Sequence, residues 1–578
     1  MSDSRPPFGP PAGPPPQGPP PPSDEVSYGW SEPPEPQRGS RRRWLLMGAG
    51  VVAAGAIVAG AAFGAASVLG GTKKPSGPAT ALPASTFAFA SIDTDPADGQ
   101  IGDLLGILAK FPGFTKQLSL QGSGAGTSTD PRQLVFNAIA KSRGGLGSCH
   151  LSWNDDLAPW LGNQFAIAGV PVDNKPQPVA VAQVTDTSKA SAEVTKLQGC
   201  DHADSYALSG DWLLVAPQRS AIDAVTKGVS AGTLADDPTY QHWMGEIGDA
   251  GIVQAYAAPS AGAMMAATLT NGAAGAAGAA GVPGSSSQML GGMCPGAAGG
   301  GSAASSQAAL RGFRGGAATV RVRDGGIETE SAVDMGSSAG SAVPGSGAAG
   351  TGSGAATLVT SLPADTSAAV GLSMGTHPWE SILSRLSSMC GGSLGAGQID
   401  SYLGGLTGLN LPGDIDTLLG NGLALSVGPL DMSTLDRVGS DPSALPVALQ
   451  FSGDAGAIQG VVHKVLDKIG QAAGVPVGSV IGVDANGNRV AVGPSSTYRK
   501  AVLGNGGLGA DPTFQNAVPD ASKASSIFYV DLDRFDPLVK SASASAYKDY
   551  FAPLQAVGVA GWGDSDHVSH SLMRVTTD

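Results

Sequence analysis

The strongest pattern along the chain is an uncharged, mostly apolar stretch from Trp44 to Thr72, with basic residues at Arg41–Arg43 before it and Lys73–Lys74 after it. A helix needs about 20 mostly apolar residues to cross a membrane, and this stretch lacks the polar face of a globular surface helix. The pattern predicts one transmembrane helix over residues 44–72. Because basic residues collect on the cytoplasmic side of a span, we expect a single-pass protein of the cell membrane with its N-terminus in the cytoplasm and the bulk of the chain extracytoplasmic.

An export signal is a second interpretation of the same region. Residues 40–46 resemble a twin-arginine signal. A cleaved signal usually has a shorter apolar core of about 7–15 residues, which favours a retained anchor, although cleavage stays open from the sequence. Gly60 and Gly64 have the spacing that lets two membrane helices approach closely, but this spacing also arises by chance where Gly and Ala are abundant.

A Pro-rich tail, residues 1–43, precedes the predicted span. Proline fixes φ and has no amide N–H, so the tail is predicted to be disordered and to sample extended polyproline II. Segments of this kind bind aromatic-lined grooves. A cytoplasmic partner of the tail is therefore one hypothesis, and a solvated spacer is the other.

Beyond residue 80, alternating apolar positions predict strands, and apolar positions at helical spacing predict helices. The predicted strands cover residues 87–92, 165–170, 179–184, 206–208, 212–215, 252–256, 318–322, 327–333, 480–483 and 489–492, with a hairpin at 558–575. The predicted helices cover residues 103–111, 131–139, 187–197, 220–227 and 238–247. Hairpin-joined strands with helices between them indicate an α+β fold with mostly antiparallel sheets.

Two segments interrupt this pattern. Residues 261–316 are rich in Gly, Ala and Ser, with too few apolar groups to offset the entropy of ordering. They are predicted to be a mobile insertion, with a helix around residues 264–269 as an open alternative for part of it. Residues 336–357 are predicted to be a flexible Gly/Ser linker.

Short segments of the first half return in the same order in the second half. The pairs are Leu82-Pro83-Ala84 with Leu362-Pro363-Ala364, Leu161-Gly162-Asn163 with Leu419-Gly420-Asn421, Pro178–Val181 with Pro446–Leu449, Leu214–Pro217 with Val490–Pro494, and Asp237–Gln241 with Asp511–Gln515. A single match is unremarkable in a Gly-rich chain, but an ordered series is not. We predict two tandem related α+β repeats with packed helices, over residues 80–335 and 358–578, which together exceed one hydrophobic core.

Composition excludes one class of partner. The formal net charge is −14, and no clustered basic face of the kind that binds phosphate backbones is present. We therefore expect no nucleic acid partner.

The four cysteines, Cys149, Cys200, Cys294 and Cys390, show no metal-binding spacing. An even number of cysteines outside the cytoplasm suggests disulfides, and three connectivities exist. The pairing Cys149–Cys200 with Cys294–Cys390 is favoured because each bond closes a local loop. Free thiols remain the alternative.

The chain resembles a known family at several motifs. They are Leu82-Pro83, Phe89–Pro96, Lys110–Gly113, Pro159–Gly162 and Leu234–Pro238. These look like the bacterial domain of unknown function 3352 family, whose members are single-span envelope proteins of high-GC Gram-positive bacteria. The resemblance covers roughly residues 80–578, with a departure at Gly371–Met374. It implies compartment and architecture, and brings no catalytic residues.

Two apparent enzyme motifs lack the context that they need. Gly504–Gly509 spells a dinucleotide-binding G-x-G-x-x-G, but a helix precedes it where a strand is required. G-x-S-x-G occurs around Ser230, Ser338 and Ser393, in linkers or after helices, where no nucleophile elbow forms.

Candidate metal ligands are few. Asp484–Asn488 mimics the start of a calcium loop but lacks the later Gly and Glu, so a hairpin is predicted there. The aspartate pairs are candidates for a divalent cation or, more plainly, turn and cap residues; they are Asp93 with Asp95 and Asp531 with Asp533. His567 and His570 are expected to face opposite sides of a strand, so we do not expect them to bind the same metal ion. No cofactor, metal or catalytic residue is predicted.

The sequence thus favours a membrane-anchored, non-catalytic envelope protein that contacts an envelope protein or wall component through its duplicated ectodomain. The alternatives are an extracytoplasmic hydrolase, or a protein binding a small or lipidic ligand, at a cleft between the repeats. A flat exposed apolar patch would favour the first interpretation.

Overall fold

The structure is a computed structural model. It describes residues 77–111, 151–270, 312–336, 353–373, 408–535 and 551–578, apart from short gaps, and isolated residues between these ranges. The predicted tail and span, and most of the predicted insertion and linker, lie outside the described residues. Among the described residues, no helix combines the length and the apolarity that a membrane span requires.

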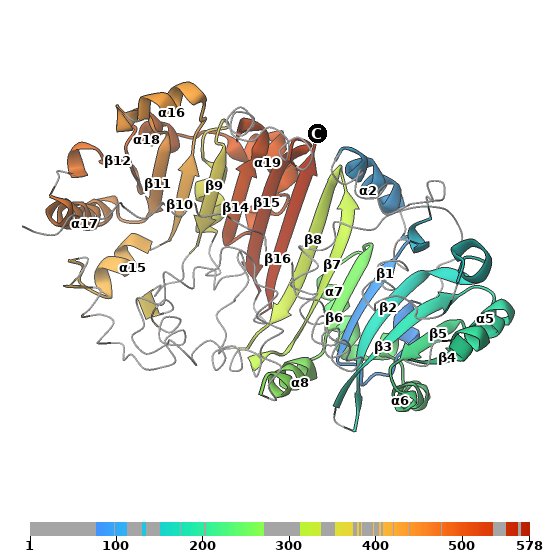
Figure 1. The fold of residues 1–578 in the computed structure, drawn as a ribbon. Coiled ribbons are helices and arrows are strands. Elements are labelled where there is room, and N and C mark those ends of the chain that lie inside the picture. The colour runs from blue at the N-terminus through green and yellow to red at the C-terminus, as the bar shows by residue number, and fades with distance from the viewer. Residues whose placement is uncertain are drawn as a thin grey trace, which may run out of the picture. The chain divides into compact units, whose positions relative to one another are not determined.

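An antiparallel sheet of 16 strands with helices packed on it runs through the described part of the chain, so the predicted α+β class is confirmed (Figure 1). The strands of the first half are β1 (Ala88–Asp93), β2 (Leu161–Val172), β3 (Lys175–Val184), β4 (Ser205–Ser209), β5 (Trp212–Ala216), β6 (Val253–Ala257), β7 (Gly315–Arg323) and β8 (Gly326–Asp334). Those of the second half are β9 (Ala368–Leu372), β10 (Gly422–Val427), β11 (Val447–Ser452), β12 (Gly482–Asn486), β13 (Arg489–Gly493), β14 (Ser526–Asp531), β15 (Leu554–Gly563) and β16 (Ser569–Thr577).

The strand order reads the same from both ends of the sheet. From one end it is β4-β5-β3-β2-β1-β6-β7-β8, and from the other it is β12-β13-β11-β10-β9-β14-β15-β16. The last strands of the two halves, β8 and β16, pair antiparallel at the centre of the sheet. The pairing runs from Val333 opposite Ser569 to Gly326 opposite Thr576. The two halves therefore share one sheet.

Helices connect the strands in both halves. In the first half these are η1 (Pro78–Ala81), α2 (Gln100–Ala109), η3 (Trp153–Leu157), α5 (Thr187–Cys200), α6 (Arg219–Val229), η4 (Leu234–Asp236), α7 (Pro238–Glu246) and α8 (Pro259–Thr270). In the second half they are α12 (Gly354–Thr360), α15 (Gly413–Leu419), α16 (Met432–Val438), η6 (Pro442–Ala444), α17 (Ala455–Ala473), η7 (Val477–Ser479), α18 (Ser496–Val502), η8 (Leu508–Ala510), α19 (Pro512–Ala517) and η9 (Ala521–Lys523).

Face A of the sheet, which carries Phe89 and Tyr529, holds the two largest clusters of buried apolar side chains. Alternate residues of a strand point to the same face, so small and aromatic side chains of successive strands line it. In the first half α6 and α7 pack here through Ile222 and Trp243. In the second half α12, α18 and α19 pack here, with Phe514 of α19 fully buried. Each half thus builds its own core on the same face.

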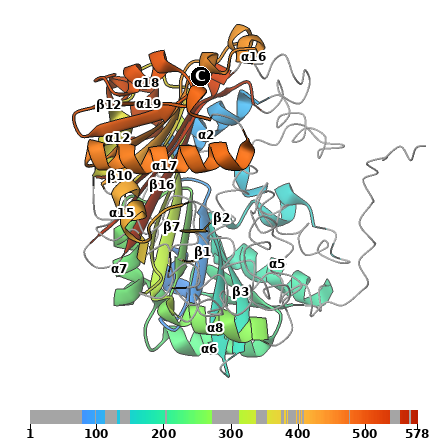
Figure 2. The ribbon, with the colours of Figure 1, turned by 90° about the vertical axis from the view of Figure 1, so that its left-hand side faces the viewer.

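Face B, the opposite face, is covered toward the outer strands. Helix α5 packs there in the first half through Val194 and Leu197, and α17 packs there in the second half through Ile458 and Val462. Figure 2 shows α17 in orange along its full length. Helix α2 covers the part of face B formed by β6, β7 and β8.

The returning sequence segments adopt matching local structures. Pro83 forms an isolated bridge with Thr233, and Pro363 forms one with Gly507. Asp237 caps α7 by accepting from the amide of residue 240 (2.9 Å), and Asp511 caps α19 by accepting from the amide of residue 514 (3.0 Å). These contacts come from the segments that repeat in the sequence.

Three boundaries differ from the sequence prediction. Helix α8 begins at Pro259 and covers residues 264–269, where a helix was the open alternative, and the first residues of β7 fall inside the insertion predicted over 261–316. Helix α12 begins at Gly354, inside the predicted linker, because Leu358 and Val359 bury an apolar face in the core. Of the helix predicted over 131–139, only the first turn, residues 131–133, is described.

One aligned segment is shifted by a residue. The sequence aligns Val179 with Val447, whereas the buried face A positions are Val179 in β3 and Ala448 in β11. Alternation of similar small apolar residues makes the two alignments look alike in sequence, and burial separates them.

Candidate functional site

The first aspartate pair lies in a turn at the end of β1. The Asp95 amide donates to Asp93 Oδ1 (2.9 Å), and Gln164 Nε2 donates to Asp93 Oδ2 (2.9 Å). Asn163 Nδ2 donates to Asp95 Oδ2 at 3.4 Å. These hydrogen bonds give the pair a role in ordering the turn.

The two side chains of the second aspartate pair do not form a joint ligand site. Asp531 is buried and accepts from Arg534 Nε at 2.6 Å, while Asp533 is exposed on the following turn. Among the described residues, neither pair belongs to a group of ligand-type side chains spaced closely enough to hold a metal ion.

Cys149 and Cys200 form a disulfide, the pairing favoured from the sequence. Their Cα atoms are 5.3 Å apart, and the bond ties the end of α5 to the segment before η3. Cys294 and Cys390 lie outside the described residues.

The apparent enzyme motifs have structural roles where they are described. Ser230 follows α6, and its Oγ donates to Thr226 O at 3.2 Å, so it is not on a strand-to-helix turn. The stretch 504–509 leads from α18 into η8, and a Cβ at Gly506 would collide with the main chain of Leu362. Ser338 and Ser393 lie outside the described residues.

The calcium-like segment is the predicted hairpin between β12 and β13, with Gly487 at φ 60° in its turn. Asp484 Oδ2 lies 2.8 Å from Arg499 Nε, so an internal cation already satisfies this carboxylate.

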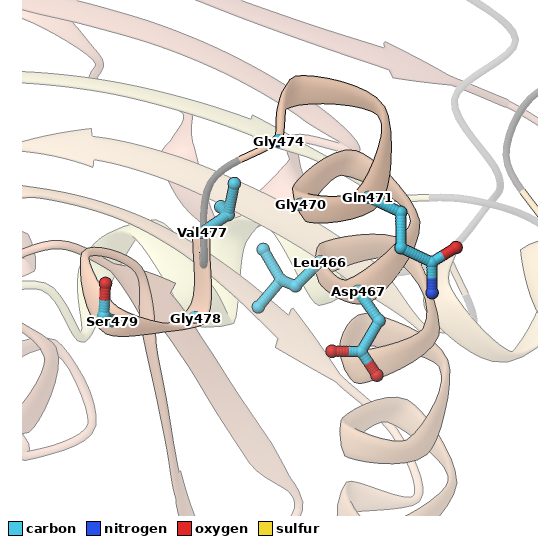
Figure 3. A pocket seen from close by; sticks show the side chains of 8 residues that line it. All are labelled: Leu466, Asp467, Gly470, Gln471, Gly474, Val477, Gly478 and Ser479. Carbon is cyan, nitrogen blue, oxygen red and sulfur yellow. The ribbon is translucent and has the colours of Figure 1, made fainter.

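A shallow hollow of about 450 Å³ lies between the end of α17 and η7 (Figure 3). Leu466 extends into it and Val477 borders it, whereas the amide of Gln471 is turned the other way. Several polar side chains aimed at one point would mark a small-molecule site, and this hollow does not provide them.

A row of apolar side chains crosses three neighbouring strands on face B. Leu425 of β10 pairs with Val370 of β9, which pairs in turn with Phe528 of β14. Leu425 is 42% exposed and Phe528 is 41% exposed. Large apolar side chains that share one exposed face mark an interaction surface more often than chance exposure does.

The junction between the halves carries buried charges on face A. Glu328 of β8 lies between two guanidinium groups, with Oε1 2.6 Å from Arg321 Nε and Oε2 3.7 Å from Arg574 Nη1. Arg321 also contacts Glu330 through Nη2. Because Arg574 belongs to β16, this network joins both halves.

A second polar group lies at the same junction. Glu246 ends α7, Asp564 follows β15, and His570 lies in β16. One ligand atom from each residue lies within 4.8 Å of the others, and His570 is buried. The structure places His570 in this group, while the other histidine considered from the sequence, His567, lies outside the described residues.

Sequence reasoning missed this group because its members are far apart in the chain. The signal available was the spacing of His242 and Glu246, four residues apart on one helix. Their side chains do approach, with His242 Nδ1 3.7 Å from Glu246 Oε1.

Comparisons of the chain with family models, curated proteins and solved structures give no match. The family resemblance seen in the sequence therefore remains a prediction.

Proposed function

We propose that this chain is a membrane-anchored, non-catalytic envelope protein whose duplicated extracytoplasmic part binds another envelope protein or a wall component. The proposal combines a single span at residues 44–72 with two related repeats at residues 80–335 and 358–578. The resemblance to the domain of unknown function 3352 family remains our expectation for the family of this chain.

The shared strand order supports the duplication. Corresponding strands of the halves have the same neighbours, and their final strands pair with each other at the centre. That arrangement is what a two-fold dimer of single repeats would form, here within one chain.

A disulfide supports the extracytoplasmic location, because disulfides persist in oxidising compartments and are rare in the cytosol. The Cys149–Cys200 bond meets that expectation. Membrane fractionation combined with protease treatment of intact cells tests the location directly.

The row Leu425–Val370–Phe528, which is exposed at its two ends, is the observation that carries the interaction role. The place of Phe528 is taken in the first half by Ala255, which is buried. At this position the second half exposes a large apolar side chain, where the first half buries a small one. A difference between two otherwise similar halves favours a role in binding over one in folding.

Site-specific photo-crosslinking tests this role in intact cells. A photoreactive residue replaces Phe528 in the full-length protein, or replaces Ile469, which is 48% exposed on α17 outside the row, as the matched control. An anchor-only protein reports background. We expect a recurrent envelope product from position 528 that is missing from position 469.

The variant Phe528→Ala, which imitates the first half, is expected to lower the yield of the same complex from a neighbouring crosslinker at Leu425. Identical products from positions 528 and 469, or none above the anchor-only background, would refute the proposed role of this surface.

A further inference from the structure

We propose that Glu246, Asp564 and His570 bind a divalent transition-metal cation, Zn²⁺ being the best match, which bridges the two halves of the sheet. The proposal does not depend on the interaction role above. It assigns a site to residues that no sequence motif connects.

His570 is the central residue of the group. Its side chain is 8% exposed, and its Nε2 lies 3.7 Å from Glu246 Oε2 and 3.6 Å from Asp564 Oδ2. Both distances are too long for good hydrogen bonds, so the imidazole faces two carboxylates at ion-pair distance without a hydrogen bond to either. A buried polar side chain aimed into an acidic group in this way is unusual unless something lies between them.

The spacing matches that of ligands around a cation. Zn²⁺ binds His nitrogen and carboxylate oxygen at about 2.0–2.2 Å with tetrahedral geometry, which places neighbouring ligand atoms about 3.4 Å apart. The separations of 3.6 and 3.7 Å are close to that value. One nitrogen and two oxygens suit Zn²⁺, and a solvent molecule would complete four ligands.

Packing and turn contacts hold the donors in place. The ring of His570 stacks on Trp562, with centroids 5.2 Å apart and planes 2° from parallel. Asp564 accepts from the Val568 amide through Oδ1 (2.9 Å), and the Asp564 amide donates to Val568 O (3.1 Å).

The first half has a different pair of buried side chains at the positions that correspond to Trp562 and His570. Trp562 pairs with His570 across β15 and β16, as Arg321 pairs with Glu328 across β7 and β8. In the first half, the buried side chains neutralise each other at 2.6 Å. In the second half, the buried His570 instead faces carboxylates from both halves, since Glu246 comes from α7. A bound cation would neutralise them.

Titration calorimetry of the purified, EDTA-stripped full-length protein with Zn²⁺ alone tests the proposal. We expect binding near one ion per chain and a rise in the unfolding temperature on adding Zn²⁺. His570→Ala and Glu246→Gln should each weaken Zn²⁺ affinity at least about tenfold, because each removes a direct ligand and even supporting residues of metal sites are worth about 10–100-fold.

Two controls keep the result interpretable. His463→Ala removes an exposed histidine on α17 and should leave binding unchanged. Glu246→Gln changes a partly exposed residue at the end of α7, so we expect this variant to fold, which circular dichroism checks. It tests the site even if His570→Ala fails to fold. Lack of stoichiometric binding to the wild-type chain, or wild-type affinity in Glu246→Gln, would overturn the proposal.

Discussion

Glu328 of the first half and Arg574 of the second lie directly opposite each other on β8 and β16, with Oε2 and Nη1 3.7 Å apart. Both side chains are buried. The carboxylate of Glu328 also binds Arg321, so it sits between one cation from each half. The central strand pairing thus depends on charge as well as on backbone hydrogen bonds.

Replacing Glu328 with Gln should destabilise the whole sheet. The substitution keeps the shape but leaves Arg321 with Glu330 alone, and Arg574 with the exposed Asp324 alone, as carboxylate partners. Breaking a buried pair costs about 3–5 kcal/mol. Urea unfolding of the purified protein measures the loss. Asp223→Asn, which breaks the exposed Arg219–Asp223 pair, is the matched control and should cost under about 1 kcal/mol. A loss no larger in Glu328→Gln than in this control would refute the role of Glu328.

The two helix caps should be equivalent. Asp237→Ala and Asp511→Ala each remove a side-chain acceptor from the first turn of α7 or α19, which costs about 1 kcal/mol. Denaturant unfolding of both variants measures the losses. Asp237→Asn and Asp511→Asn keep the acceptor oxygen and should retain most of the stability. A loss at one position alone would contradict the structural match between the halves.

Tyr240 should make the protein sensitive to alkali. Burial between Phe89 and Tyr256 raises the pKa of Tyr240 to about 12. A raised pKa means that the unfolded chain ionises first, so the stability is complete below about pH 10 and falls as the pH rises toward 12. At pH 11 this group alone should account for a loss of about 1.4 kcal/mol.

Tyr240→Phe is the test, because the second half already has Phe514 at the matching position of α19. Urea unfolding at pH 9 and at pH 11 should show a smaller loss in Tyr240→Phe than in the wild type. Burial also raises the pKa values of Tyr256 and Tyr529, so part of the loss will remain. Equal losses in both proteins would show that Tyr240 is not responsible.

Much of the fold follows from local sequence signals. The strand pair β2–β3 and the hairpins β4–β5 and β12–β13 were predicted because alternating apolar positions flank turn residues, and Gly210 and Gly487 adopt the positive φ of 57° and 60° that such turns need. Helix α12 was missed because five of its seven residues are Gly, Ala or Thr, and its two large apolar side chains show their role only when they pack in the core.

The central junction was beyond sequence reasoning for a different reason. Pairing of β8 with β16 depends on which strands remain available after each half has formed, and no short motif records that. The group around His570 depends on the same pairing, because α7 reaches Asp564 and His570 only once the halves are joined.

The pairing of β8 with β16 also bears on aggregation. It occupies two nine-residue strands and leaves β4 and β12, of five residues each, at the margins of the described sheet. Short marginal strands offer few free amide and carbonyl groups to another chain. By placing its longest terminal strands against each other, this molecule removes its best template for fibril growth.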